Sequence, residues 1–352
     1  MPMNKNMKVC FILNNVPDFR AVFLNNLSRY VDVIVISGKC DGVSKIESKE
    51  EIKFKHIIIK QTKFFGLLLE PDLLKSSYFK NVDVIFMSAN LKAVFRGIVA
   101  RTNKVFKKKA IWWGLFFGPY ENWLVKKYRK FFLFPISIAA THSNKVAKLL
   151  IKEYGINAQS YNNSQVFLNE FKSLPFSHEI NTLKVLFVGT YKKRKKIERL
   201  LEIAKRNGEK VKIRIIGSGM NELIKKTSGI DNIKFYDRTI GNDLENHFLW
   251  SDVVMSPGNM GLLVSTAAKY NRAVIYDSAS YHGPEVELAE DSRQYSIPFA
   301  DEEKIDNLIN RLIAEPTTLK DHAMALQLCA KNNYNVENMI KVHLSLINDS
   351  RS

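Results

Sequence analysis

Short β-branched apolar runs alternate with amphipathic segments along the first half of the chain. Residues 7–38 hold two such runs, and between them apolar side chains recur at helical spacing at Phe19, Val22, Phe23 and Leu27. A strand, helix, strand succession of this kind implies a parallel sheet. Further buried strands are predicted at 54–60, 82–88 and 108–114, with a helix at 90–106. The first half is therefore predicted to be an open α/β sheet.

The same succession starts again near residue 183. A strand, a loop, a helix and a strand are predicted over 183–219, after a polar, proline-containing stretch at 168–182 that we take as the domain linker. Further strands are predicted at 233–239, 252–258 and 272–277, with a small-residue helix at 262–270. The order β-α-β-α-β-α-β predicts a second doubly wound sheet. Residues 302–347 look helical, with a break near Pro316.

The length of the chain fits two domains, because 352 residues exceed what one hydrophobic core usually serves. We expect an N-terminal domain at 1–175, a C-terminal domain at 183–330 and a C-terminal helix at 331–352 that packs back on the N-terminal domain. Ligands of open α/β sheets bind at the carboxyl ends of the strands. Two facing sheets would therefore share a central cleft.

Nearly all the excess positive charge lies in the first half. Residues 1–175 hold 28 basic and 12 acidic residues, a net charge of +16, and the remainder holds 25 and 23, a net charge of +2. Such a half attracts polyanions or an anionic membrane surface. One alternative is a lysine-rich surface that reflects a lysine-rich proteome. Another is a basic nucleic-acid-binding protein, although a zinc knuckle, an RNP-type aromatic motif and a basic helix with heptads are missing.

Three scattered cysteines, Cys10, Cys40 and Cys329, are too few for a disulfide framework or a metal knuckle, so a reducing cytoplasm and no metal are expected. The apolar stretch near the N-terminus lacks a small-residue cleavage site and is predicted to be a strand. The later apolar run at 131–140 is far shorter than the span of about 20 residues that a bilayer requires. No segment is expected to cross a membrane.

Four segments of the second half form an ordered series. They read VLFVGTYKKRKKIERLL, IRIIGSGMNEL, WSDVVMSPG and GLLVSTAAKYNRAVI. In this order and spacing they resemble the C-terminal domain of the group 1 family of glycosyltransferases, which have the GT-B fold. In the first half, VPDFRAVFLNNLS, IWWG and YNNS are faintly similar to bacterial polysaccharide glycosyltransferases of that family.

The resemblance implies two Rossmann-like doubly wound domains, with the acceptor on the first and the donor on the second. The implied enzyme moves a sugar from a nucleotide-diphosphate-sugar to a saccharide or polyprenyl-diphosphate-linked acceptor, with retention of anomeric configuration. Its product would belong to a surface polysaccharide such as lipopolysaccharide or capsule. The nucleotide-sugar is a substrate, so no cofactor is expected. The implied location is the cytoplasm, at the inner face of the cytoplasmic membrane.

Charge on the leaving group guides the assignment of site residues. Breaking the anomeric C–O bond places negative charge on the departing diphosphate, which fixed cations and N–H donors stabilise. Lys195 and Arg194 are the candidate catalytic cations, and no base is assigned. Gly261 and Leu262 open a predicted helix and would offer free N–H groups. The donor-binding candidates are Gly189, Thr190, Gly217, Gly219, Asn259, Gly261, Leu262, Thr266 and Glu285.

Some positions depart from the family pattern. The family usually carries two glutamates eight positions apart beside the donor, where this chain has Gly258 and Thr266, and Thr190 replaces a loop arginine. These departures motivate a second hypothesis, a non-catalytic relative that binds nucleotide-sugar or scaffolds a complex. For KKRKK at 192–196 the alternative to a site is a solvated charge run. For Glu285 it is a helix N-terminal residue after a proline.

Arg20 and His142 are the candidates on the acceptor side. Arg20 would start the first helix, and His142 would end a strand near the cleft. The competing interpretations are a surface guanidinium on a buried stem and a structural histidine. Aromatic side chains at 115–124 would dip into a membrane interface, and the alternative is that they pack in the core.

Overall fold

The structure is a computed structural model that describes residues 7–38, 52–79, 81–102, 110–118, 121–176, 179–227 and 229–350. Cys40 and parts of the predicted elements at 90–106 and 108–114 lie outside these residues. By its contacts the chain divides into two units, residues 1–165 with 336–352 and residues 166–335. The first division falls before the expected boundary at 175, and the second falls after the expected boundary at 330.

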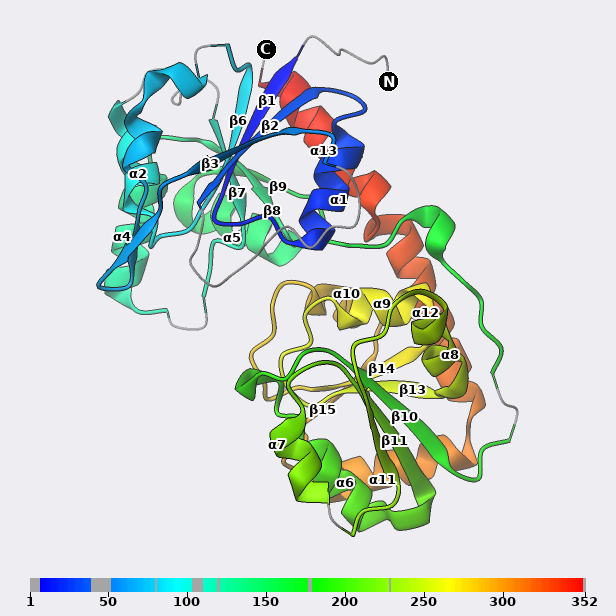
Figure 1. Cartoon of the computed structure of the whole chain (residues 1–352). Helices are drawn as coiled ribbons and strands as arrows, with labels where there is room; N and C mark the ends of the chain where they lie inside the picture. Colours follow the sequence, from blue (N-terminus) through cyan, green and yellow to red (C-terminus); the bar gives the residue numbers. More distant parts are fainter. Residues whose placement is uncertain are drawn as a thin grey trace. The chain divides into compact units, whose positions relative to one another are not determined.

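The first unit is built on a parallel sheet of seven strands (Figure 1). In spatial order they are β3 (Lys55–Ile59), β2 (Asp32–Gly38), β1 (Lys8–Leu13), β6 (Val84–Ser88), β7 (Ala110–Gly114), β8 (Ile138–Thr141) and β9 (Asn157–Ser160). The central strands are nearly continuous apolar runs because helices cover both faces of the sheet. Inside, the Phe11 ring stacks on Phe86 with 4.8 Å between centroids.

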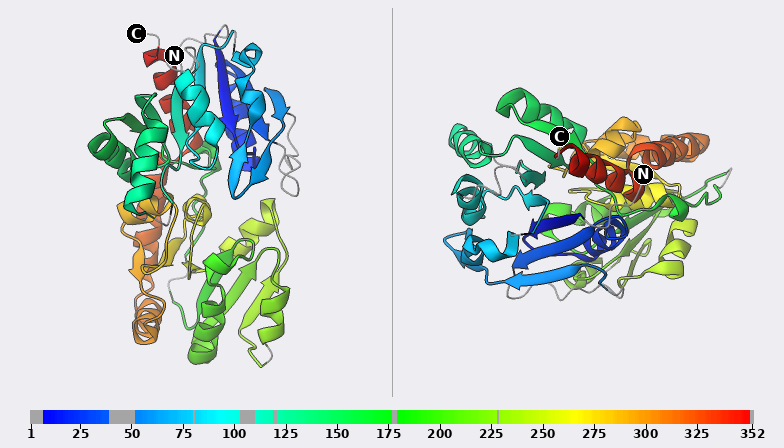
Figure 2. Two further views of the ribbon diagram at one scale, coloured as in Figure 1. Left: turned by 90° about the vertical axis from the view of Figure 1, so that its left-hand side faces the viewer. Right: turned by 90° about the horizontal axis from the view of Figure 1, so that it is seen from above.

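Helices of the first unit lie on opposite faces of this sheet (Figures 1 and 2). One face carries α1 (Asp18–Leu27) and the C-terminal helix α13 (Val336–Asp349), which contact each other. The other face carries α2 (Val94–Thr102), α4 (Trp123–Leu133) and α5 (Asn144–Tyr154). A hairpin that the sequence pattern did not predict, β4 (Thr62–Phe64) and β5 (Leu67–Leu69), precedes two short 3-10 turns at Pro71–Leu74 and Ser76–Phe79.

His343 fixes α13 to the first unit. Its Nε2 accepts a hydrogen bond of 3.0 Å from the Trp113 indole N–H, and its Nδ1 donates one of 2.7 Å to the carbonyl of Met339. Complete burial lowers the pKa of His343 to about 3. The ring is therefore neutral at physiological pH, and both of its nitrogens are used in holding the helix.

The second unit is a parallel sheet of six strands. In spatial order they are β12 (Ile233–Tyr236), β11 (Val211–Ile216), β10 (Leu183–Val188), β13 (Val253–Ser256), β14 (Ala273–Asp277) and β15 (Tyr295–Ile297). Counted within the unit this is the order 3-2-1-4-5-6 of the Rossmann fold. The prediction of two doubly wound sheets is confirmed. The short edge strand β15 was not predicted, because three half-exposed residues give no readable pattern.

Helices cover both faces of the second sheet as well (Figure 1). One face carries α6 (Glu198–Asn207), α7 (Asn221–Ile224) and α11 (Glu302–Ala314). The other carries α8 (Gly241–Trp250), α9 (Leu263–Lys269), α10 (Val286–Asp291) and α12 (Thr317–Asn333). The predicted helix break at Pro316 separates α11 from α12, and a second break follows Asn333.

The stretch predicted as a linker, 168–182, packs on the second unit instead. Phe171, Leu174 and Phe176 lie against its hydrophobic core. The Lys172 N–H donates 2.8 Å to the carbonyl of Lys269, and the Arg272 guanidinium donates 3.0 Å to that of Pro175. Apolar side chains spaced along a polar stretch bind it to the domain. Among the described residues no helix has the length and apolar character needed to cross a bilayer.

Candidate functional site

The strand order of the second unit reverses between β10 and β13. At such a switch point the loops leaving neighbouring strands diverge and open a crevice at the carboxyl edge of the sheet, where ligands of doubly wound folds bind. The loop after β10 spans 189–196, and the loop after β13 spans 257–262. These two loops contain the predicted cations and most of the predicted donor-binding residues.

Gly189 and Gly217 let two neighbouring loops touch. A Cβ at Gly217 would lie 2.2 Å from the Gly189 carbonyl oxygen, so a side chain is sterically impossible there. Their N–H groups bond inside the protein, Gly189 to the carbonyl of Ile216 at 2.8 Å and Gly217 to that of Tyr236 at 3.0 Å. These amides do not point to a ligand. The two glycines instead allow the backbones of the two loops to approach each other closely at the carboxyl edge of the sheet.

Lys195 is a partly buried cation between the loops that follow β10 and β13. Its Nζ lies 3.5 Å from the Asn259 carbonyl oxygen and 5.6 Å from the centroid of Phe187, and it packs against Gly189, where a Cβ would lie 3.2 Å away. Among the described residues no carboxylate forms an ion pair with it. Burial, reinforced by the charges of Arg194 and Lys192, lowers its pKa to about 8. A partly buried ammonium without a counter-ion is a ready site for an anion.

The side chains of the basic run at 192–196 differ in exposure and in their contacts. Arg194 is exposed, and the described contacts use only its carbonyl, which accepts 2.9 Å from the Asn259 N–H. Lys196 has a left-handed backbone (φ 48°) that turns its ammonium to within 3.5 Å of the buried Asp277 carboxylate, which Arg199 also binds at 2.9 Å. The structure therefore places Lys195 partly buried between the two loops and leaves the Arg194 side chain exposed.

Gly258 locks the loop after β13 onto the loop after β10. A Cβ at Gly258 would lie 2.5 Å from the Arg194 carbonyl oxygen and 2.5 Å from the Lys195 carbonyl carbon. Both obstacles are backbone atoms, so neither can rotate away. At the position where relatives usually have a glutamate, this chain has no room for any side chain.

The turn before α9 offers unbonded N–H groups. Within the part of the chain that the structure describes, the N–H groups of Gly261, Leu262 and Leu263 have no hydrogen-bond partner, and no side chain caps the helix. Gly261 has φ 58°, a conformation that glycine adopts without strain. Helix α9 begins at Leu263, so Gly261 and Leu262 form the turn in front of it. This turn leaves β13, on the same edge of the sheet as Lys195.

A third loop, 278–285, braces the loop after β13. His282 accepts 3.3 Å from the Met260 N–H with its Nδ1, while its Nε2 donates 2.7 Å to the Asp277 carbonyl. The Asn259 amide donates 3.2 Å to the carbonyl of Tyr281. Sequence reasoning missed His282 and Asp277 because their partners are far away in sequence. The available signal was a strand ending in aspartate and followed closely by histidine.

The remaining donor candidates lie at the same edge or just behind it. Thr190 is exposed, and its hydroxyl accepts 3.3 Å from that of Ser218. Gly219 has φ 79° and faces the Cβ of Tyr191 at 3.5 Å. The Thr266 hydroxyl donates 3.2 Å to the Leu262 carbonyl, on the first turn of α9.

Glu285 occupies the N-cap position of α10 and folds back over Gly283. A Cβ at Gly283 would lie 2.4 Å from a Glu285 carboxylate oxygen. The carboxylate therefore occupies the position that the alternative interpretation gave it, at the start of a helix. It lies on the same loop as His282, which keeps it within the candidate region.

In the first unit the structure brings Arg20 and His142 together. Arg20 Nη2 lies 3.3 Å from His142 Nε2, and the guanidinium stacks over the Trp113 ring at 4.1 Å from its centroid. Both side chains are 7% exposed, so the Arg20 guanidinium does not lie at the surface. Burial, and then the Arg20 charge, lowers the pKa of His142 well below its ordinary value. Since a guanidinium only donates, His142 Nε2 accepts and the ring proton sits on Nδ1.

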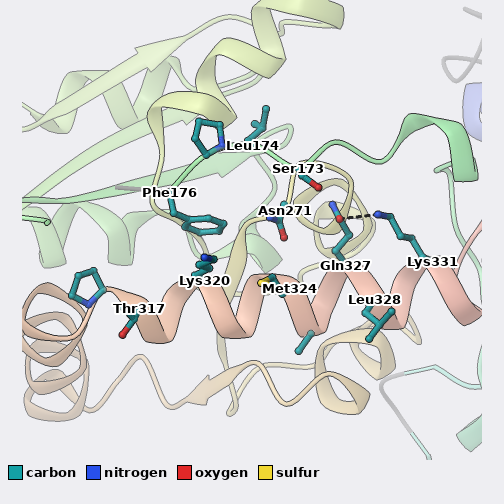
Figure 3. A pocket seen from close by; sticks show the side chains of 13 residues that line it. Ser173, Leu174, Phe176, Asn271, Thr317, Lys320, Met324, Gln327, Leu328 and Lys331 are labelled. Atoms are coloured by element: carbon teal, nitrogen blue, oxygen red, sulfur yellow. Dashed lines mark hydrogen bonds between the residues drawn. The ribbon is translucent and has the colours of Figure 1, made fainter. Parts of the chain in front are cut away.

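A hollow of about 710 Å³ lies elsewhere on the second unit, between α12 and the segment 173–176 (Figure 3). Its ionisable groups are Lys320 and Lys331, and Lys331 already donates 3.0 Å to Gln327. Without a carboxylate, a histidine or a loop of the sheet edge it offers no chemistry for a reaction. Among the described residues no cluster of three or more potential metal ligands exists.

Comparisons with known proteins bear on the fold and on the family of the second unit. Residues 170–331 match the family model described as glycosyl transferases group 1. No curated protein matches the sequence significantly.

Solved structures share the fold over nearly the whole chain. A glycosyltransferase from Rickettsia africae is 15% identical with a TM-score of 0.72, and 99% of each chain is covered. Anabaena HepE in complex with UDP-glucose is 15% identical with a TM-score of 0.70, covering 96% of this chain and 99% of its own. The lipopolysaccharide outer core galactosyltransferase WaaB is 12% identical with a TM-score of 0.67, covering 97% and 100%. At these identities the similarity shows a common fold.

Proposed function

Because residues 170–331 match the group 1 glycosyltransferase model and the chain has the GT-B fold, we propose that it transfers a sugar from a nucleotide-diphosphate-sugar to a saccharide or lipid-linked saccharide. UDP is the first nucleotide to test, since a structural relative was solved with UDP-glucose. Retention of anomeric configuration and a role in surface polysaccharide synthesis are part of the proposal.

The observation that supports the proposal is Lys195. A cation that is partly buried, has no carboxylate partner among the described residues and lies at a switch point is unfavourable in the empty protein. Binding of an anion there restores the charge balance. The unbonded N–H groups of Gly261, Leu262 and Leu263 leave the neighbouring strand at the same edge and suit a second phosphate oxygen.

This arrangement favours departure of a diphosphate. When the anomeric C–O bond breaks, its electron pair passes to the bridging phosphate oxygen, and the growing charge strengthens every N–H contact to the diphosphate. Lys195 and the free amides are fixed before the reaction begins, so no reorganisation is needed. Arg194, exposed beside Lys195, would bind the outer phosphate oxygens as a second cation.

We place the acceptor on the first unit, at Arg20 and His142. The guanidinium is held by its stacking on Trp113, and the neutral imidazole faces it. This pair suits hydroxyl and phosphate oxygens of a polyprenyl-diphosphate-linked saccharide. A protein acting on such an acceptor would work in the cytoplasm, at the inner face of the membrane.

The decisive experiment measures binding and transfer with Lys195→Ala. We expect the variant to lose donor affinity or turnover by more than about tenfold, as when a preorganised counter-charge is removed. Lys193→Ala, in the same basic run but exposed, is the matched control and should behave like the parent protein. A thermal-shift panel of nucleotide-sugars would identify the donor, and the anomeric configuration of the product is read by NMR. Equal activity of the Lys195 variant and the parent would remove Lys195 from the mechanism.

One observation favours a second candidate, a non-catalytic protein that binds nucleotide-sugar. The backbone packing at Gly258 removes the position from which relatives contact the donor with a glutamate. Donor binding without hydrolysis or transfer, over a panel of donors and acceptors, would establish this candidate over the enzyme.

A further inference from the structure

Helix α4 carries large apolar side chains on its exposed face. Trp123 is 63% exposed, Phe131 63% and Phe134, which follows the helix, 81%. Lys127 and Lys130 share this face, because the five positions follow the spacing i, i+4, i+7, i+8 and i+11. The face that packs on the sheet holds Arg129, Phe132 and Leu133. A surface helix of a water-soluble domain normally shows polar residues outside, so this exposed face needs an explanation.

Three cations and two phenylalanines line a hollow on this face. The hollow has a volume of about 460 Å³ and is formed by Arg101, Lys127, Lys130, Phe131 and Phe134. The Arg101 guanidinium lies over the Phe131 ring at 3.7 Å. The Lys127 ammonium lies 4.7 Å from the centroid of Trp123. Charge and apolar surface are therefore interleaved and not segregated.

No carboxylate among the described residues neutralises these three cations. Glu121, just before α4, pairs with the buried Arg129, and Glu153 of α5 pairs with Lys126. The hollow therefore keeps its positive charge and is complementary to an anion whose surroundings are apolar.

The hairpin β4–β5 adds a second apolar projection. Phe65 is 90% exposed and has φ 46°, a conformation that a bulky side chain adopts only at a cost. Two-residue hairpin turns of this kind normally place asparagine or glycine there. Phe64 is 59% exposed and contacts Phe65 edge to face at 4.6 Å between centroids. Neither packing in the fold nor turn geometry accounts for a phenylalanine at this tip.

The hairpin and the two helices are joined side by side. The Leu68 N–H donates 2.7 Å to the carbonyl of Lys92, just before α2. Gly97 of α2 packs on Phe132 of α4, where a Cβ would lie 2.9 Å from the ring. Helices α2 and α4 accordingly lie together on one side of the first unit (Figure 1). We call the exposed part of hairpin β4–β5, α2 and α4 the aromatic-basic face.

We propose that the aromatic-basic face docks on a lipid bilayer, with an anionic phospholipid headgroup in the hollow of Arg101, Lys127 and Lys130 and the aromatic side chains in the interface. An interfacial helix has this composition, aromatic and basic side chains together on one surface. Trp and Phe favour the boundary between headgroup and acyl chain, and each cation near anionic lipid adds attraction.

Two other occupants fit the observations less well. Single-stranded nucleic acid stacks on aromatic side chains, but Leu124, 58% exposed, and Ile98, 40% exposed, offer no ring for a base. A second copy of the chain would bring the same uncompensated cations together at the interface, which costs free energy. Both occupants become outcomes of the test.

Docking on a bilayer would bring the protein to the lipid-linked acceptor of the proposed function, and this biological purpose rests on that function. The lipid contact itself is measured without any transfer reaction. Failure of one therefore does not imply failure of the other.

The experiment is co-sedimentation of the full chain with two kinds of vesicle. One is phosphatidylcholine alone, and the other contains about 30% phosphatidylglycerol, which gives a negative surface charge. We expect binding to the anionic vesicles only, weakened by salt. Trp123 reports insertion, because Trp112 and Trp113 are 0% and 4% exposed, and the fourth tryptophan, Trp250, lies on the second unit under the Arg214 guanidinium. Its fluorescence should shift to shorter wavelength on binding, and Trp123→Phe should abolish that shift while binding continues.

Variants separate the charge from the apolar contribution. Lys127→Gln with Lys130→Gln should weaken binding about 25-fold, at about fivefold per cation. Phe65→Ser with Phe134→Ser, made in the parent protein, should weaken vesicle binding to a similar extent. Lys320→Gln with Leu328→Ser, at the hollow beside α12, is the matched control, since Leu328 is 61% exposed and the exchange is of the same kind. Circular dichroism confirms that each variant is folded.

Three results would overturn the proposal. The first is absence of binding by the parent protein to anionic vesicles. The second is equal loss of binding in the control pair. The third is vesicle binding that is unaffected by the variants while single-stranded DNA affinity or self-association is lost. Free inorganic phosphate distinguishes a headgroup in a bilayer from an isolated anion, because it should not compete at millimolar concentration.

Discussion

The unusual pKa of Lys195 makes donor binding depend on pH in a specific way. Burial holds the pKa of the free protein at about 8. A bound diphosphate supplies the missing counter-charge, so the pKa in the complex should return at least to the ordinary value of about 10.4. The donor therefore binds the protonated form and increases its proton affinity.

The direction and size of the effect follow from this pKa pair. Below pH 8 the ammonium is already formed and the dissociation constant should be constant. Above pH 8 a proton must be acquired on binding, so the dissociation constant should rise about tenfold per pH unit. At pH 8 half the free molecules are deprotonated, and binding should take up about half a proton.

Isothermal titration of UDP-glucose in buffers of different ionisation enthalpy measures this proton uptake directly. Lys195→Arg is the informative variant, because a guanidinium stays protonated and should give a flat profile between pH 7 and 9. Lys193→Ala should keep the parent profile, since its ammonium is exposed. A parent protein that binds with no proton uptake at pH 8, and with equal affinity at pH 7 and 9, would show that Lys195 does not contact the diphosphate.

Three further outcomes are expected. Gly258→Ala should lower the stability of the second unit by about 1–3 kcal/mol in thermal unfolding, because the added Cβ would collide with backbone atoms. Gly118→Ala is the control, since nothing lies within 4 Å of a Cβ there. Equal melting temperatures of the two variants would contradict the packing described at Gly258. His343 has a folded pKa near 3, below its unfolded value, so its contribution is complete above about pH 6.5 and is lost as the pH falls, at about 1.4 kcal/mol per unit. His343→Phe should flatten that acid limb in denaturant titrations, and an unchanged limb would assign it to another group. Arg20→Lys should raise the acceptor KM more than about tenfold without changing UDP affinity, and a changed UDP affinity instead would remove Arg20 from the acceptor side.

Apolar periodicity was sufficient to predict the two sheets. Runs such as 185–188 and 253–255 are apolar throughout because both faces of a parallel strand are covered, and that pattern is local. The elements that escaped prediction carry little local signal. Strand β15 is short, half-exposed and at an edge, and hairpin β4–β5 has a phenylalanine where turn residues normally stand.

The candidate site was predictable in part. Lys195 was selected from its place between a strand and a helix, and its burial, its lowered pKa and its missing partner are tertiary facts. Five consecutive basic residues could not predict that the Arg194 side chain is exposed while Lys196 pairs with a carboxylate. A left-handed residue at 196 and a buried carboxylate at Asp277 decide them.

The sequence by itself determined the strand–helix alternation of both halves, the two doubly wound sheets and the glycine loops at their carboxyl edges, because these follow from periodicity and backbone chemistry over short distances. Only the tertiary structure decided which charges are buried, which amides remain unbonded and which aromatic side chains face water. Burial and hydrogen bonding depend on neighbours that are distant along the chain, as between Gly258 and Arg194. Those long-range contacts, and not the residue types, set the electrostatics on which both proposals rest.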